Sequence, residues 1–129
     1  MHPTLNQDDP AKSTLEVIQR FNEAVNRHAV DAVMAAMTDD CVFENTYPPP
    51  DGERFEGQSA VRAFWEQFFR SSPQASFDTE EIFAAGDQGV VRWVYHWVEA
   101  DGKQGHIRGV DVFHVRHGRV AEKMSYVKG

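Results

Sequence analysis

The chain has 129 residues, which suffices for one domain that buries roughly two-thirds of the surface of its unfolded form. Hydrophobic residues make up 41% of the chain and charged residues 26%, proportions that exclude a largely disordered protein. The net charge is −7 and Lys and Arg are not clustered, so we expect neither nucleic acid nor a membrane surface as a partner.

The N-terminal segment differs in composition from the rest of the chain. Residues 1–12 are polar and contain two prolines, which predicts a flexible arm in front of a single domain over residues 13–129. One cysteine cannot form a disulfide within the chain, and no apolar run approaches about 18 residues. Because a signal-peptide core is also missing, these features predict a cytoplasmic protein.

Two consecutive helices are predicted after this arm. The segment STLE, which begins at Ser13, has the spacing of a capping box and predicts a helix start there. Apolar residues then recur at helical intervals up to Val25. A second, shorter apolar stripe begins at Val30 and stops before Thr38, which predicts a second helix.

A short strand, an irregular loop and a third helix are predicted next. The segment CVFEN, residues 41–45, is typical of a strand. The segment TYPPPDGERFEG, residues 46–57, is expected to lack regular structure because of its prolines and glycines, and it is a candidate rim or lid. Residues 58–70 have apolar side chains at the i, i+3, i+4, i+7 spacing of an amphipathic helix: Val61, Phe64, Trp65 and Phe68.

Four strands are predicted in the second half, over residues 75–84, 90–100, 103–116 and 119–128. Short turns that contain glycine separate them, which favours antiparallel hairpins. Helices followed by a meander of strands predict an α+β fold. In this fold, three N-terminal helices pack on the concave face of a curved, mainly antiparallel sheet.

An acid within the third of these strands raises the main functional question. The alternation of strand side chains puts Asp111 on the same face as Ile107 and Phe113. A carboxylate there must be paired, protonated or in a wet cavity, because a bare buried charge costs several kcal/mol or more. The functional interpretation is a general acid or base, and the alternative is a structural acid bonded to a neighbour.

The side chains that Asp111 meets depend on the register of the hairpin before it. A two-residue turn over residues 101–102 would pair Trp93 with Val110 and direct Asp111 away from the aromatic residues. A three-residue loop over residues 101–103 pairs Trp93 with Asp111 instead. We prefer the second register because it gathers the apolar residues on one face.

The last hairpin completes the predicted interior. A two-residue turn over residues 117–118 pairs Asp111 with Met124 and puts Glu122 and Tyr126 on the same inward face. The interior is then aromatic with few polar groups, the usual composition of a small-molecule site. The expected catalytic residues are Asp111 and Asn45. We expect the ligand to contact ten further side chains: Phe21, Phe43, Trp65, Phe68, Trp93, Tyr95, Trp97, Phe113, Met124 and Tyr126.

The layout of residues 14–127 resembles the SnoaL-like group of the NTF2-like superfamily, whose fold is a cone of helices and a curved sheet. The stretches that carry the resemblance are VIQRFNEAVNRHAVDAVMAAMTDDCVFEN, FEGQSAVRAFWEQFF and GVDVFHVRHGRVAE. The resemblance predicts the fold well and the function poorly. This superfamily includes isomerases, cyclases, hydrolases, dehydratases and non-enzymatic binding modules.

Ketosteroid isomerase, a relative with this layout, implies an aspartate base at the end of the first strand, a tyrosine and a protonated aspartic acid. Asp111 in GVDVF matches the protonated acid. Asn45 stands at the position of the base and Phe21 at the position of the tyrosine, so two of three groups are missing. Isomerisation by that mechanism is therefore not expected, although Asn45 and Asp111 can still orient a carbonyl group.

Limonene-type epoxide hydrolases share the cone and carry a Tyr and an Asn two residues apart before a proline-rich loop, which FENTYPPP resembles. Asn45 matches the Asn, but Phe43 replaces the Tyr. These enzymes also use an Asp-Arg-Asp relay, and no Arg-Asp pair occurs around residues 93–95. Polyketide cyclases, a looser resemblance, imply one acidic proton shuttle in the cone, and Asp111 fits that role.

Two functions from different classes follow. We expect a small-molecule enzyme that acts on an apolar, oxygen-bearing substrate by acid/base or carbonyl-polarising chemistry, with neither a metal nor an organic cofactor. The alternative is a non-catalytic ligand-binding or dimerisation module. A homodimer is expected through the convex sheet face, on which four valines lie: Val94, Val98, Val110 and Val112.

Overall fold

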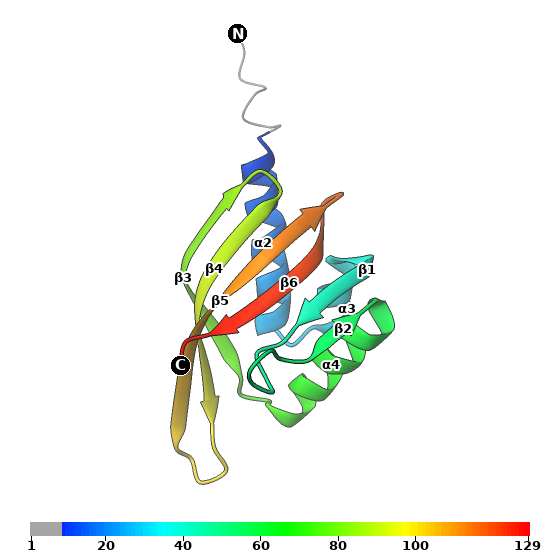
Figure 1. Ribbon diagram of the computed structural model, residues 1–129. Coiled ribbons are helices and arrows are strands. Elements are labelled where there is room, and N and C mark those ends of the chain that lie inside the picture. The colour runs from blue at the N-terminus through cyan, green and yellow to red at the C-terminus, as the bar shows by residue number, and fades with distance from the viewer. Residues whose placement is uncertain (1–8) are drawn as a thin grey trace.

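The computed structural model describes residues 9–129, and most of the predicted arm, residues 1–8, lies outside the described residues. Three helices and six strands follow in the chain order α2 (Pro10–Asn26), α3 (Val30–Ala35), β1 (Met37–Glu44), β2 (Arg54–Glu56), α4 (Gln58–Ser71), β3 (Ser76–Ala85), β4 (Gln88–Val98), β5 (Gln104–Arg116) and β6 (Arg119–Val127). The helices cover one face of a curved sheet (Figure 1). The predicted α+β architecture is therefore confirmed.

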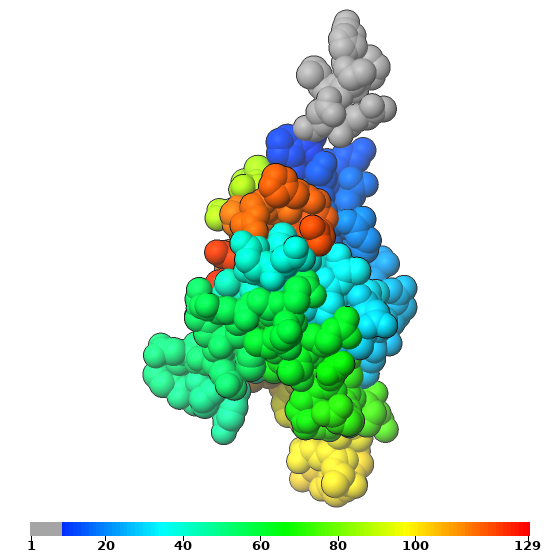
Figure 2. Space-filling model, turned by 90° about the vertical axis from the view of Figure 1, so that its right-hand side faces the viewer, coloured from blue at the N-terminus to red at the C-terminus, as the bar shows by residue number. Residues whose placement is uncertain are grey.

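The sheet has six strands in the order β2-β1-β6-β5-β4-β3. Strand β1 runs parallel to β6, and every other neighbouring pair is antiparallel. The tip of the β4–β5 hairpin and the loop between β1 and β2 project from the same end of the molecule (Figure 2). Among the helices of residues 9–129, none is long and apolar enough to span a membrane.

Helix α2 begins earlier than the capping box predicts. Its N-cap is Asp9, whose Oδ1 accepts a hydrogen bond of 3.0 Å from the backbone N–H of Ala11. Pro10 occupies the first turn, where its missing N–H costs nothing because that group has no partner within a helix. The predicted start at Ser13 was therefore wrong, and residues 10–12 are helical rather than part of a flexible arm.

The loop predicted over residues 46–57 contains a short strand, which the prediction missed. Residues 54–56 form β2 and pair antiparallel with β1, Phe55 opposite Phe43. The prolines lie before this strand, at positions 48–50, so they remove no N–H group from its pairing. A partner distant in sequence decides the structure of β2, because its three residues carry too little local signal.

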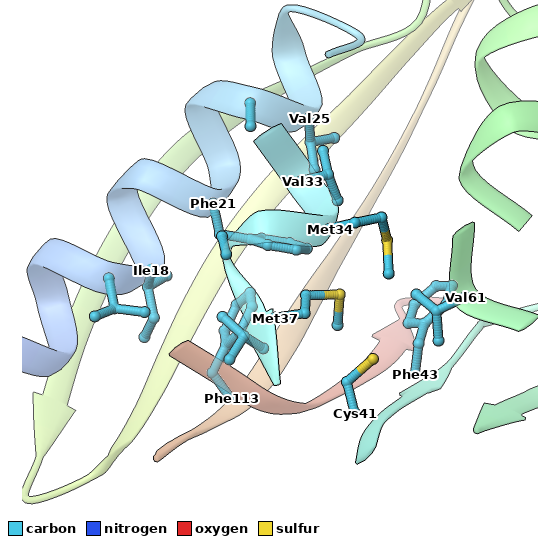
Figure 3. Packing of buried hydrophobic residues seen from close by; sticks show 14 of the residues in the cluster. Ile18, Phe21, Val25, Val33, Met34, Met37, Cys41, Phe43, Val61 and Phe113 are labelled. Atoms are coloured by element: carbon cyan, nitrogen blue, oxygen red, sulfur yellow. The ribbon is translucent and has the colours of Figure 1, made fainter. Parts of the chain in front are cut away.

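The interior between helices and sheet is closely packed. Phe21 of α2 lies with its ring edge toward Phe113 of β5, and their ring centroids are 5.7 Å apart (Figure 3). Helix α4 is held at its start by Gln58, whose Nε2 lies 3.0–3.2 Å from three backbone carbonyl oxygens of the α3–β1 segment. This half-buried side chain ties the start of α4 to the segment between α3 and β1.

The β4–β5 hairpin has a three-residue loop, one position earlier than predicted. The N–H of Glu99 donates to the carbonyl of Lys103 at 2.7 Å, so residues 100–102 form the loop. Trp93 then pairs with Gly109, and Asp111 pairs with Val91. The predicted pairing of Trp93 with Asp111 was wrong. Because the error is two residues in register, the predicted face is right, and Asp111 points toward the helices.

The β5–β6 hairpin differs by one residue, and this changes the face. Its turn lies where predicted, but a bulge near Ala121 shifts the register between His114 and Val115. Asp111 pairs with Ser125 rather than with Met124. The predicted inward position of Glu122, Met124 and Tyr126 was therefore wrong: these side chains lie on the convex face, and Lys123 and Ser125 face inward.

Candidate functional site

Three polar side chains from β5 and β6 meet beneath the helices. Ser125 Oγ lies 2.6 Å from Asp111 Oδ1 and donates to it. Lys123 Nζ lies 2.8 Å from Ser125 Oγ and 3.3 Å from Asp111 Oδ2. The side chains of Asp111 and Lys123 are 8% and 9% exposed. We call these three residues the polar cluster, and its acid is the residue whose burial the strand pattern predicts.

The hydrogen-bonding groups of the polar cluster fit together. The Ser125 hydroxyl has one proton to donate, which goes to the Asp111 carboxylate, and its lone pairs accept from Lys123. Two buried ions each cost several kcal/mol of desolvation, so only close pairing and additional hydrogen bonds make them tolerable. The structure supplies both, which is why an acid persists on an otherwise apolar face.

Lys123 is the ionisable group that burial affects most clearly. Burial lowers the pKa of Lys123 below its ordinary value, and the neighbouring charge of Asp111 opposes that decrease. Nζ also lies 4.6 Å from the ring centroid of Phe43 and 5.7 Å from that of Trp65. Aromatic faces attract an ammonium group, so these rings offset part of the loss of hydration that Lys123 undergoes on burial.

A pocket of about 200 Å³ opens in front of the polar cluster. Its lining side chains come from β1 and the loop after it, from α4 and from β3 to β6: Phe43, Asn45, Thr46, Phe64, Trp65, Phe68, Phe77, Trp93, Tyr95, Ile107, Lys123 and Ser125. Ser125 and Lys123 line this pocket, whereas Asp111 lies behind them. Asp111 therefore contacts the pocket only by way of these two side chains.

Aromatic rings in mutual contact form most of the pocket wall. Phe43 stacks on Trp65 with 5.4 Å between ring centroids, and Phe77 stacks on Tyr95 at 4.8 Å. Phe77 is held by α2, because Asn26 exchanges two hydrogen bonds of 2.9 Å with its backbone. Burial raises the pKa of the Tyr95 phenol, which keeps its proton available as a donor. The wall is thus apolar and fixed, with few polar groups.

Two buried indole N–H groups lie among these rings without a partner. Within residues 9–129, Nε1 of Trp65 and Nε1 of Trp93 are inaccessible to solvent and make no hydrogen bond. Both indoles line the pocket and also a small void of about 20 Å³ beside Asp111. That void has room for about one water molecule. Unpaired buried donors are rare in folded proteins.

The structure brings together only part of the predicted site. Six predicted residues line the pocket: Asn45, Phe43, Trp65, Phe68, Trp93 and Tyr95. Phe21 and Phe113 are fully buried in the core beneath it, and Trp97 lines a different hollow near the tip of the β4–β5 hairpin. Met124 and Tyr126 lie on the convex face because of the bulge in β6. These five side chains, which were predicted to contact the ligand, do not line the pocket.

Sequence reasoning missed the two polar residues at the pocket wall. Lys123 and Ser125 alternate with Met124 and Tyr126, so a one-residue shift exchanges the two pairs. A lysine between Ala121 and Ser125 in a strand is a weak signal, because most lysines face solvent. Phe77 and Ile107, which also line the pocket, were not predicted either.

Within residues 9–129, no three His, Cys, Asp or Glu side chains converge to hold a metal ion.

Helices over one face of a curved sheet, with an aromatic pocket that ends at a buried polar cluster, define the class of cone-shaped α+β proteins. The chain belongs to the family of SnoaL-like domains, whose family model matches residues 18–123. The resemblance predicted from the sequence is therefore confirmed. No curated protein shows significant similarity to the chain.

Solved structures support the same fold. An NTF2-like protein of unknown function from Mesorhizobium loti is 40% identical, with 99% of this chain and 98% of that chain covered and a TM-score of 0.79. A Mycobacterium tuberculosis protein in complex with estradiol-17β-hemisuccinate is 25% identical, over 88% of this chain and 92% of that chain, with a TM-score of 0.75. An LEH-like epoxide hydrolase from the same organism is 19% identical, over 92% of this chain and 84% of that chain, with a TM-score of 0.74. A likeness at this identity shows the fold alone.

Proposed function

We propose that this protein is a small-molecule enzyme that binds an apolar, ring-containing carbonyl compound in the aromatic pocket and polarises its carbonyl group. The observation that carries the proposal is the polar cluster at the pocket wall. It places one hydrogen-bond donor, Lys123 Nζ, and the Ser125 hydroxyl oxygen in an apolar cavity, with a carboxylate directly behind them. Apolar walls with a few convergent polar groups are typical of ligand sites.

The chemistry follows from what each group can donate or accept. A carbonyl oxygen at the wall accepts from Lys123 Nζ, and the low polarity of the surroundings strengthens that bond. Asp111 is positioned to receive a proton by way of the Ser125 hydroxyl, to which it is bonded at 2.6 Å. The amide of Asn45, which also lines the pocket, can orient the same oxygen but cannot take a proton.

The volume of the pocket limits the ligand. At about 200 Å³ it is smaller than the roughly 300 Å³ or more of sites for drug-sized molecules. We therefore favour one or two rings over a fused four-ring skeleton lying wholly inside. The relative solved with an estradiol conjugate supports an oxygen-bearing, ring-containing ligand class.

A non-catalytic binding module is the second candidate, and one observation favours it. At the end of β1, where ketosteroid isomerase carries its aspartate base, this chain has Asn45, and Phe21 stands at its tyrosine position. A binding module needs the pocket and the Lys123 donor but no proton acceptor. The two candidates therefore differ in what the removal of the Asp111 charge should do.

Replacing Asp111 with asparagine tests the proposal. In D₂O, wild-type protein should accelerate deuterium exchange next to the carbonyl of 2-tetralone, measured by NMR. Asp111→Asn should slow this exchange by roughly 100-fold or more, because a general acid/base group contributes about that much. Binding, measured by tryptophan fluorescence, should change little. The matched control is Asp39→Asn, which changes an exposed carboxylate of β1 and should leave the exchange unaltered.

The outcomes separate the two candidates. If wild type binds 2-tetralone but does not accelerate exchange, the binding module is supported and the enzymatic proposal is lost. If no ring-containing ketone binds, both candidates fail. Circular dichroism of each variant distinguishes loss of chemistry from loss of fold.

We also propose that two copies of the chain pair through the convex sheet face. The single cysteine is in keeping with a reducing compartment such as the cytoplasm, which we propose as the location. Strand pairing aligns an apolar row across this face, Phe83, Val90, Val112 and Met124. Phe83 and Tyr126 on this face are each 53% exposed. Exposed apolar side chains aligned in this way are typical of contact surfaces.

The pairing proposal is tested by molar mass in solution. Light scattering coupled to gel filtration should give twice the mass of the chain for wild type, and the monomer mass for Val112→Glu. A charge at the centre of the apolar row would be buried without a partner on pairing. The control Gln19→Glu adds the same charge on the exposed side of α2 and should leave the dimer intact. A monomeric wild type would contradict the proposal.

A further inference from the structure

Lys123 differs in environment from the other three lysines of the chain. Lys12, Lys103 and Lys128 are exposed, whereas Lys123 is 7% exposed and ends at the aromatic pocket. Its Nζ lies over the rings of Phe43 and Trp65, within hydrogen-bond distance of Ser125. An amine is thus aimed at a space that the proposed function fills with a carbonyl compound.

We propose that Lys123 captures a small aromatic aldehyde or ketone as a covalent Schiff base in this pocket. The inference rests on the proposed function for the pocket and its ligand class, and it adds a covalent step at one named atom. It converts Lys123 from a donor that polarises the carbonyl oxygen into a nucleophile that attacks the carbonyl carbon.

The step balances with the groups at hand. The Lys123 ammonium first gives a proton to Asp111, 3.3 Å away. The nitrogen lone pair then forms the C–N bond as the π electrons of the carbonyl move to its oxygen. A second nitrogen proton passes to that oxygen, and Asp111 returns its proton as the oxygen leaves as water. Overall, one ammonium and one carbonyl give one protonated imine and one water, and Asp111 is regenerated.

The surroundings favour each part of this step. Burial lowers the pKa of Lys123, so less free energy is needed to form its neutral, nucleophilic amine. The carboxylate behind it provides a proton acceptor, and the Ser125 hydroxyl bridges the two groups.

Reductive trapping tests the proposal directly. Wild-type protein is incubated with benzaldehyde and sodium cyanoborohydride, which reduces an imine to a stable secondary amine. Digestion and mass spectrometry then locate the adduct among the four lysines and the N-terminus. We expect at least tenfold more adduct at Lys123 than at Lys128. Because a lowered pKa leaves the amine neutral at lower pH, labelling at Lys123 should persist at pH values where the exposed lysines no longer react.

Variants and a competitor sharpen the result. Lys128→Arg should leave the labelling of Lys123 unchanged, whereas Lys123→Arg should abolish the excess adduct. If Lys123→Arg does not fold, the distribution of the adduct among the lysines of the wild-type protein tests the proposal by itself. Benzyl alcohol, which fits the same pocket without a carbonyl, should compete with labelling. If benzyl alcohol binds by tryptophan fluorescence but the adduct spreads over the exposed lysines without excess at Lys123, the Schiff base is overturned and the proposed function stands. If neither compound binds, both proposals are overturned.

Discussion

Replacing Lys123 with methionine is expected to lower the free energy of unfolding by about 3–5 kcal/mol, although methionine fills a similar volume. The substitution leaves the Asp111 carboxylate buried without its counter-ion, and the remaining hydrogen bond from Ser125 does not replace the charge. Breaking a buried pair by removing one partner costs more than the pair contributes, because the other ion stays desolvated. Urea denaturation followed by circular dichroism measures the loss.

A double-mutant cycle shows whether the loss comes from the pair. In an Asp111→Asn background the second substitution, Lys123→Met, should cost less than half as much, because no charge is left behind. Lys128→Met, at an exposed position, should change the unfolding free energy by no more than about 0.5 kcal/mol. Equal losses at Lys123 and Lys128 would mean that Lys123 is not buried against Asp111 in solution.

Truncation of Phe113 to alanine is expected to cost about 3–5 kcal/mol as well, for a different reason. Its side chain is fully buried and packs edge-to-face against Phe21 at 5.7 Å. Removing the ring leaves a cavity between α2 and the centre of the sheet that the surrounding elements can only partly fill. Thermal and urea unfolding both report the loss.

The matched control is Phe83→Ala, which removes the same ring from the convex face, where Phe83 is 53% exposed. Its effect on the monomer should be below about 1 kcal/mol, because little apolar area leaves a buried environment. At low protein concentration this comparison separates core packing from self-association. If Phe83→Ala lowered the free energy of unfolding as much as Phe113→Ala, the assignment of the core to the helix-covered face of the sheet would be contradicted.

The two hairpins show why the site was only partly predictable. In β4–β5 the loop was misplaced by one position, so each pairing moved by two residues and Asp111 stayed on the predicted face. In β5–β6 the turn was placed correctly, but the bulge near Ala121 moved the pairing by one residue. Lys123 and Ser125 then replaced Met124 and Tyr126 beside the acid. A bulge has no dependable mark in a single sequence, whereas its effect on side-chain direction is complete.

The sequence by itself determined the fold class and the longer elements, since the apolar spacing in α2 and α4 and the alternation in the later strands are local properties of the chain. It missed β2 and the first residues of α2 and β1. It also identified Asp111 as an acid that the interior must accommodate. Only the tertiary structure decided what accommodates it. Lys123 and Ser125 reach Asp111 through the registry between strands, which depends on long-range packing and one extra residue in β6. The unpartnered indoles of Trp65 and Trp93 are likewise a property of assembled neighbours, which no segment of sequence contains.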